Sequence, residues 1–141
     1  MHDAPSTGKR WHPYATAGVL LGLCALGAQV ADHWPYISDD ALISLRYAER
    51  FAHGEGLTWT AGPPVEGYSN LLWTVVLAVP ITLGIDPLLG LRALTLGAAA
   101  AVVLGVAWPW RDKPVPATVA ALAVGADGTL GVWALGGLEQ P

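Results

Sequence analysis

The chain has 141 residues, of which 53% are hydrophobic and only 13% are charged, and its formal net charge is -4. A soluble domain usually carries about a quarter of charged residues, so this composition, with a positive mean hydropathy, indicates a membrane protein. No basic patch points to nucleic acid as a partner, and a single cysteine, Cys24, excludes an intrachain disulfide.

A first apolar stretch follows a short basic tail. Residues 14–31 contain no charged side chain, and about twenty apolar residues cross a bilayer. We therefore expect a cytoplasmic tail over residues 1–13, with Lys9 and Arg10 facing the cytoplasm, and a first transmembrane helix over residues 14–33. A cleaved signal peptide is the alternative, because "ALGAQVA" offers small residues near the end of the stretch.

Residues 34–70 carry the largest group of charges and predict an external loop with an amphipathic juxtamembrane helix over residues 39–53. Ser38 is a suitable N-cap, and Asp39 and Asp40 favour the positive end of the helix dipole. At 100° per residue the apolar and charged side chains separate onto opposite faces. One face carries Ala41, Leu45, Ala48 and Ala52, and the other carries Asp39, Arg46, Arg50 and His53.

Three further apolar stretches complete the chain. Residues 71–86 are short and contain Pro80, so we expect a juxtamembrane or re-entrant helix, and whether they cross the membrane stays open. Residues 88–110 and 115–138 predict two transmembrane helices. Asp127 interrupts the last stretch, where it is costly enough to be functional or to lie at a helix break.

The positive-inside rule favours the topology in which residues 71–86 do not cross the membrane. Arg111 and Lys113 then face the cytoplasm, and Glu139 returns to the external face together with Asp39 and Asp40. The ending "GVWALGGLEQP" carries no stop-transfer charges and no helix cap, so we expect a fragment of a longer protein.

The stretch "DDALISLRYAERFAHGEGLTWTAGPPVEGYSNLLW", followed by "WALGGLEQP", resembles the GT-C class of membrane glycosyltransferases, which take sugars from polyprenyl-phosphate carriers. It is most similar to the group containing the mycobacterial terminal arabinofuranosyltransferases. The resemblance covers residues 36–73 closely and rests elsewhere on hydropathy and the "GLE" element. The chain departs from the family's asparagine at His53 or Thr60 and from its threonine at Gln140.

This resemblance implies an all-α, polytopic transmembrane fold of the GT-C kind, of which the chain is the N-terminal portion. It implies an enzyme of the cell (inner) membrane whose active site faces outside the cytoplasm. The implied reaction moves a sugar, arabinofuranose in the most similar group, from a polyprenyl-phosphate donor to a cell-envelope glycan or another acceptor. We expect the isolated chain to lack activity, because a few helices cannot enclose both a lipid carrier and an acceptor.

The paired acids are the candidate catalytic residues. In the family the first acid of the pair is the general base, which corresponds to Asp39, and Asp40 is the second candidate. Asp40 is also a candidate ligand of a divalent cation (Mg, Mn or Ca), since these ions prefer oxygen ligands. The alternative is that Ser38, Asp39 and Asp40 only form a capped helix start.

The candidate substrate-binding residues are Arg46, Arg50, Glu66, Tyr68 and Glu139. Arginine pairs with phosphate through two parallel hydrogen bonds, so Arg46 and Arg50 are suited to the donor phosphate. The alternative for both is a solvated helix face paired with Glu49 or in contact with lipid headgroups. Glu66 is otherwise a turn residue, and Tyr68 is otherwise an aromatic side chain at the membrane interface.

Two functions of other kinds stay open. One is a truncated membrane protein without catalysis, and the other is a small transport or scaffold protein in which Asp127 and the loop acids handle ions. An ion pathway would need several charged side chains aligned within the spans, and the sequence offers only Asp127.

Overall fold

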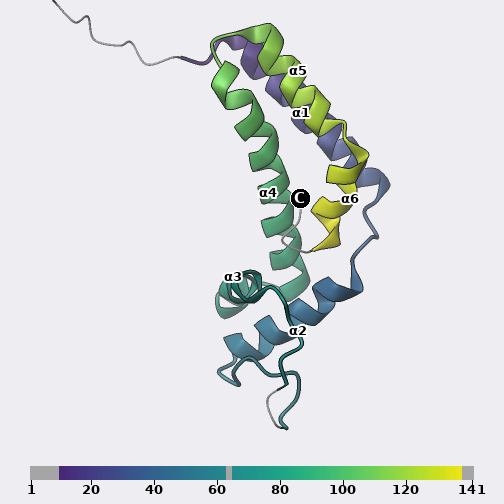
Figure 1. The fold of residues 1–141 in the computed structure, drawn as a ribbon, viewed down its shortest axis with the longest axis vertical. Coiled ribbons are helices and arrows are strands. Elements are labelled where there is room, and N and C mark those ends of the chain that lie inside the picture. The colour runs from purple at the N-terminus through teal and green to yellow at the C-terminus, as the bar shows by residue number, and fades with distance from the viewer. Residues whose placement is uncertain (1–9, 63–64, 138–141) are drawn as a thin grey trace, which may run out of the picture.

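The computed structural model describes residues 10–62 and 65–137, and within them it is helical without any strand, which confirms the predicted all-α class (Figure 1). The helices are α1 (Pro13–Asp32), α2 (Asp39–Ala52), α3 (Leu71–Thr82), α4 (Pro87–Ala107), the 3-10 turn η1 (Trp108–Trp110), α5 (Pro114–Gly125) and α6 (Gly128–Gly136).

Two helices are long and apolar enough to cross a membrane. These are α1, with 20 residues, and α4 continued through η1, with 24 residues. A third span results if α5 and α6, which are bent by 57° relative to each other, are counted as one broken crossing. α3 is apolar but has only 12 residues. The protein is therefore a helical membrane protein by length and composition of its helices.

The apolar stretch expected over residues 115–138 is broken at Asp127, where α5 is followed by α6. The Asp127 side chain accepts a hydrogen bond from the backbone N–H of Thr129 at 3.0 Å and so caps the start of α6. An ionised side chain is costly inside an apolar span, whereas at a helix start it satisfies a free backbone donor. The aspartate thus marks the helix break that was one of its two expected roles.

α1 and α5 run in the same direction and pack side by side (Figure 1). Small residues allow this close approach, since a Cβ atom added to Gly22 would lie 2.6 Å from the carbonyl oxygen of Ala121. A Cβ added to Gly18 would clash with Thr118, and one added to Gly125 would clash with the backbone of Gly22. Such small-residue contacts are the usual way in which membrane helices approach one another.

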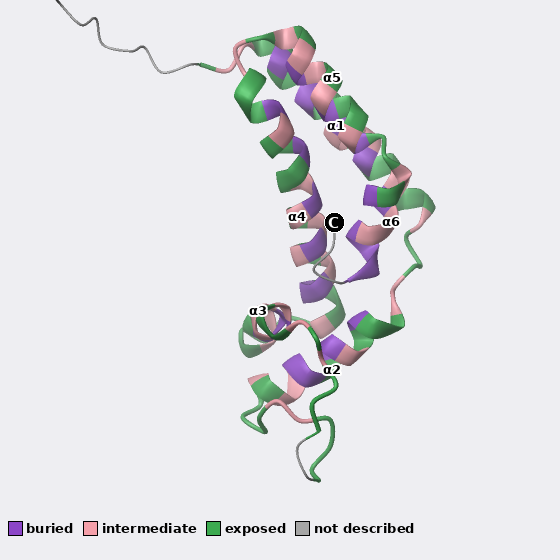
Figure 2. Cartoon of the chain, viewed as in Figure 1, coloured by how far each residue is buried: buried purple, intermediate pink, exposed green. Residues whose placement is uncertain are grey.

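Two apolar clusters hold the helices together, and Figure 2 shows their buried residues on the facing sides of the helices. The larger joins α1, α4, α5 and α6, and includes Leu26, Val103 and Leu135. The smaller joins α2 and α3 to the start of α4, and includes Leu45, Leu77 and Leu91. The predicted apolar face of α2 is the one that packs here, with Ala41, Leu45 and Ala48 buried.

The bundle has two chemically different ends. At one end the chain enters α1 beside the α4–α5 connection, where the His12 N–H donates to the Arg111 carbonyl at 2.8 Å. At the other end Arg92 of α4 donates to the Trp34 carbonyl at 3.0 Å, and α2 and α3 lie across this end (Figure 1). The bundle therefore separates Arg111 from the paired acids of α2.

Candidate functional site

The paired acids, Asp39 and Asp40, are the first two residues of α2, at the end of the bundle where α2 and α3 lie. Ser38 occupies the N-cap position in an extended conformation, but its side chain makes no capping hydrogen bond. Asp39 and Asp40 are both exposed, and the helix dipole stabilises negative charge in this first turn. A hollow with a volume of about 500 Å³ is lined by Tyr36, Ile37, Ser38, Asp39 and Asp40.

The start of α2 is held by a distant part of the chain. The Ser38 N–H donates to the Gly136 carbonyl at 3.1 Å, and the Trp73 indole N–H donates to the Gly137 carbonyl at 3.0 Å. Gly137 ends α6 in the left-handed conformation, with φ 81°, which glycine adopts without strain. A Cβ atom at this position would lie 2.8 Å from the Cβ of Ala41. Glycine is therefore required for both the backbone conformation and the contact with α2.

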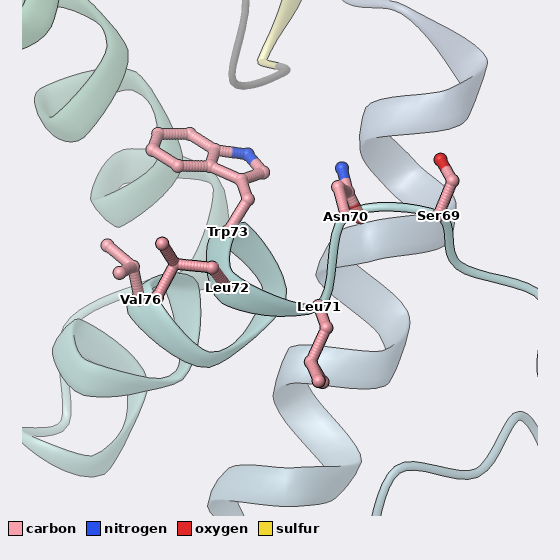
Figure 3. A pocket seen from close by; sticks show the side chains of 6 residues that line it. All are labelled: Ser69, Asn70, Leu71, Leu72, Trp73 and Val76. Carbon is pink, nitrogen blue, oxygen red and sulfur yellow. The ribbon is translucent and has the colours of Figure 1, made fainter.

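A buried polar group joins α2 to α3. The Ser44 hydroxyl lies 3.1 Å from the side-chain oxygen of Asn70, and the Thr74 hydroxyl lies 3.3 Å from the same oxygen. Ser44 is 4% exposed and Thr74 is fully buried. Asn70 lies where the loop enters α3 (Figure 3). A hollow with a volume of about 380 Å³ lies at this point. Its lining residues are Ser69, Asn70, Leu71, Leu72, Trp73 and Val76.

The two arginines of α2 line a separate hollow of about 320 Å³ together with Glu49, His53 and Glu55. Arg50 forms an ion pair with Glu55 at 2.6 Å and donates to the Thr58 hydroxyl at 3.0 Å, and its side chain is 12% exposed. Arg46 makes a longer ion pair with Glu49, at 3.6 Å, and its side chain is 47% exposed. Of the two, Arg46 is more accessible to a ligand.

The described residues do not bring the acids and the arginines into one hollow. A helix rises about 1.5 Å per residue, so Asp39 and Arg46 are roughly 10 Å apart along the axis of α2. A ligand that contacts both residues must therefore extend along this helix. Asp39 and Arg50 lie still farther apart.

The "VEGY" segment folds back onto Tyr47 of α2. The Tyr47 side chain is 2% exposed, and its hydroxyl donates to the Val65 carbonyl at 2.8 Å. The rings of Tyr47 and Tyr68 are 4.9 Å apart and meet edge to face. Glu66 is exposed while Tyr68 is half-buried, so Glu66 is the more accessible of the two.

The remaining predictions concern Glu139 and a cation at Asp40. Glu139 lies outside the described residues. No group of three or more His, Cys, Asp or Glu side chains that could hold a metal occurs in residues 10–62 and 65–137. Mg²⁺ is often bound by one or two carboxylates together with water and substrate phosphate, so the cation at Asp40 stays a prediction.

Sequence reasoning missed the residues that position the acids. Ser44, Asn70 and Tyr47 received no role, although Asn70 directly precedes an apolar run, which is typical of a helix start. Trp73 is another such residue, because its indole N–H donates to the Gly137 carbonyl. These partners belong to loops and helix ends, so periodicity along one helix does not identify them.

Comparisons of the chain with models of protein families, with curated proteins and with solved structures return no match.

Proposed function

We propose that this chain carries the catalytic acids of a GT-C type membrane glycosyltransferase, which moves a sugar from a polyprenyl-phosphate donor to a glycan acceptor outside the cytoplasm. One observation carries the proposal. Asp39 and Asp40 line a hollow at the start of α2, at the end of the bundle opposite Arg111. Contacts of Gly136 and Trp73 help to position this helix start. The two exposed carboxylates are therefore available to a polar substrate in this hollow.

In the proposed reaction the acceptor hydroxyl transfers its proton to the Asp39 carboxylate while its oxygen attacks the anomeric carbon. The bond between this carbon and the phosphate oxygen breaks, and polyprenyl phosphate leaves with the bonding electrons. A carboxylate in an exposed hollow can accept the proton directly. Arg46 is the proposed contact of the departing phosphate, because its side chain is more exposed than that of Arg50 and its ion pair with Glu49 is longer than that of Arg50 with Glu55.

The membrane placement of the site follows from the two ends of the bundle. The positive-inside rule places Arg111 and Lys113 in the cytoplasm. The paired acids then lie on the external side, close to the lipid surface that would hold the carrier. The 12 residues of α3 are too few to cross the bilayer, so the proposal puts this apolar helix at the same surface.

The test is Asp39→Asn in the complete reading frame that encodes this chain, with sugar transfer measured in membranes at matched amounts of folded protein. Asp39 follows the N-cap Ser38, and asparagine there loses only a dipole interaction of about 0.3 to 1 kcal/mol, so folding should be retained. Loss of a general base typically lowers a rate about 10² to 10⁴-fold, and we expect a loss of this size. Asp40→Asn should lower the rate less.

Asp32→Asn is the matched control, because Asp32 is also exposed and lies at the same end of the bundle, at the last residue of α1. It should leave the transfer rate unchanged. A near wild-type rate for Asp39→Asn would show that the base lies elsewhere, with Glu66 as the next residue to test.

A further inference from the structure

The end of the bundle opposite the paired acids carries a cluster of tryptophans and cations. The rings of Trp11 and Trp108 are 5.9 Å apart and meet edge to face. The Arg111 guanidinium lies 4.9 Å from the centre of the Trp108 ring, and the Lys113 ammonium lies 6.0 Å from the centre of the Trp110 ring. Trp108 is 56% exposed and Trp110 is 43% exposed, so the cluster is a surface.

The lengths of the helices place this cluster at the level of the lipid headgroups. A helix of 20 residues is about 30 Å long, which matches the hydrocarbon thickness of a bilayer. Trp11 precedes α1, while Trp108 and Trp110 form the end of the α4 span. Tryptophan is favoured at this depth because its ring is apolar and its N–H is polar.

An apolar groove begins directly beneath the cluster. It has a volume of about 240 Å³ and lies between α1 and α5, lined by Tyr14, Pro114, Val115, Thr118 and Val119. Tyr14, Val115 and Val119 are 72%, 71% and 61% exposed, so the groove opens to the surroundings of the bundle. Lys113 immediately precedes Pro114, which places a cation at the headgroup end of an apolar channel.

The charges of this end favour an anion. Arg10 and Lys113 are exposed. Asp112 is the only acidic side chain in the described part of this end, and it is flanked by Arg111 and Lys113. The surface therefore attracts a negative headgroup more than a zwitterionic one, whose positive group would find few carboxylates.

We propose that this end is a binding site for an anionic phospholipid, with the phosphate at Lys113 and Arg10 and one acyl chain in the groove between α1 and α5. The exposed tryptophans and the apolar groove favour a lipid over a free anion. This proposal concerns the face away from the paired acids and does not depend on the proposed glycosyl transfer.

The experiment places the full chain in nanodiscs that contain equal amounts of phosphatidylglycerol and phosphatidylcholine with identical acyl chains. Native mass spectrometry then measures which lipid stays bound. We expect the wild type to retain phosphatidylglycerol preferentially. Arg10→Gln with Lys113→Gln should lower this preference on the order of fivefold for each removed charge.

A second variant tests the groove without changing the charge. Val115→Trp fills the groove with a side chain at an exposed position, so the fold should persist while the retained lipid is lost. The matched controls lie at the other end of the bundle. Arg46→Gln removes one exposed cation, and Leu72→Trp enlarges a side chain that is 78% exposed. Both controls should retain the lipid as the wild type does.

Equal retention of the two lipids by the wild type would overturn the proposal, and so would an unchanged preference in the double variant. Loss of the lipid in Arg46→Gln to the same degree would show a general charge effect and would also overturn it. Displacement of the lipid by millimolar inorganic phosphate would identify a free-anion site instead of a lipid site.

Discussion

The side chain of Asp127 determines where the apolar stretch of α5 and α6 is interrupted. Its carboxylate accepts the Thr129 N–H at 3.0 Å, and the chain changes direction by 57° between α5 and α6. Without this acceptor, an N–H group at the start of α6 would lose a partner in an apolar environment, where unsatisfied donors are costly.

We therefore expect Asp127→Ala to lower the free energy of unfolding by about 1 kcal/mol, as for other N-cap replacements. Asp127→Asn should be nearly neutral, because the amide oxygen can accept the same hydrogen bond. The measurement is the thermal unfolding midpoint in detergent. Asp32→Ala is the control, and equal midpoints for Asp127→Ala and the wild type would contradict the capping role.

The apolar face of α2 could be predicted residue by residue, whereas its polar contacts could not. Ala41, Leu45 and Ala48 recur at helical spacing, and all three are buried. The pairing of Arg50 with Glu55 depends on how the chain turns after α2 ends. Helical periodicity carries no information about such a turn, so Glu49 was the expected partner.

At the scale of elements, the contact between α1 and α5 depends on residues without side chains. Gly22 faces the Ala121 carbonyl directly, whereas no atom lies within 4 Å of a Cβ added to Gly27. Both glycines belong to α1, so the same substitution at the two positions distinguishes the effect of interhelical packing on stability from the effect of helix propensity.

Gly22→Val is expected to weaken the α1–α5 contact by about 1 to 3 kcal/mol, the usual cost of inserting methyl groups into a packed interface. Gly27→Val should be neutral or slightly stabilising. Unfolding by a graded denaturing detergent measures both variants. If the two variants unfold alike, the close packing of these helices is not a determinant of stability.

Hydropathy alone located the apolar helices, and it located the ends of the long ones closely. The spans expected over residues 14–33 and 88–110 correspond to α1 and to α4 with η1. The helix expected over residues 71–86 ends at Thr82. Hydropathy measures composition and not the direction of a helix, so it could not reveal the angle of 57° between α5 and α6.

At the scale of the whole molecule, the topology can be tested without any assay of activity. Cys24 is the only cysteine, so Cys24→Ala provides a background for single cysteines at Lys113 and Glu66, both of which are exposed. We expect a membrane-impermeant maleimide to label Glu66→Cys in intact cells. Lys113→Cys should react only after the membrane is opened.

Labelling of Lys113→Cys from outside would reverse the orientation and would remove the paired acids from the external face. From the number of crossings, the sequence predicted that Glu139 and these acids share the external face. The contact of Gly136 with Ser38 required the structure, because it depends on the bend after α5.

The hydrogen bond between Trp73 and Gly137 joins residues that are 64 positions apart, and this separation sets an order of events during synthesis. At roughly 5 to 20 residues per second, Trp73 is made about 3 to 13 s before Gly137 is made. During that interval α2 can pack against α3, but the contact between Ser38 and Gly136 of α6 has not yet formed. The hollow beside Asp39 therefore takes its final shape only after α6 has formed.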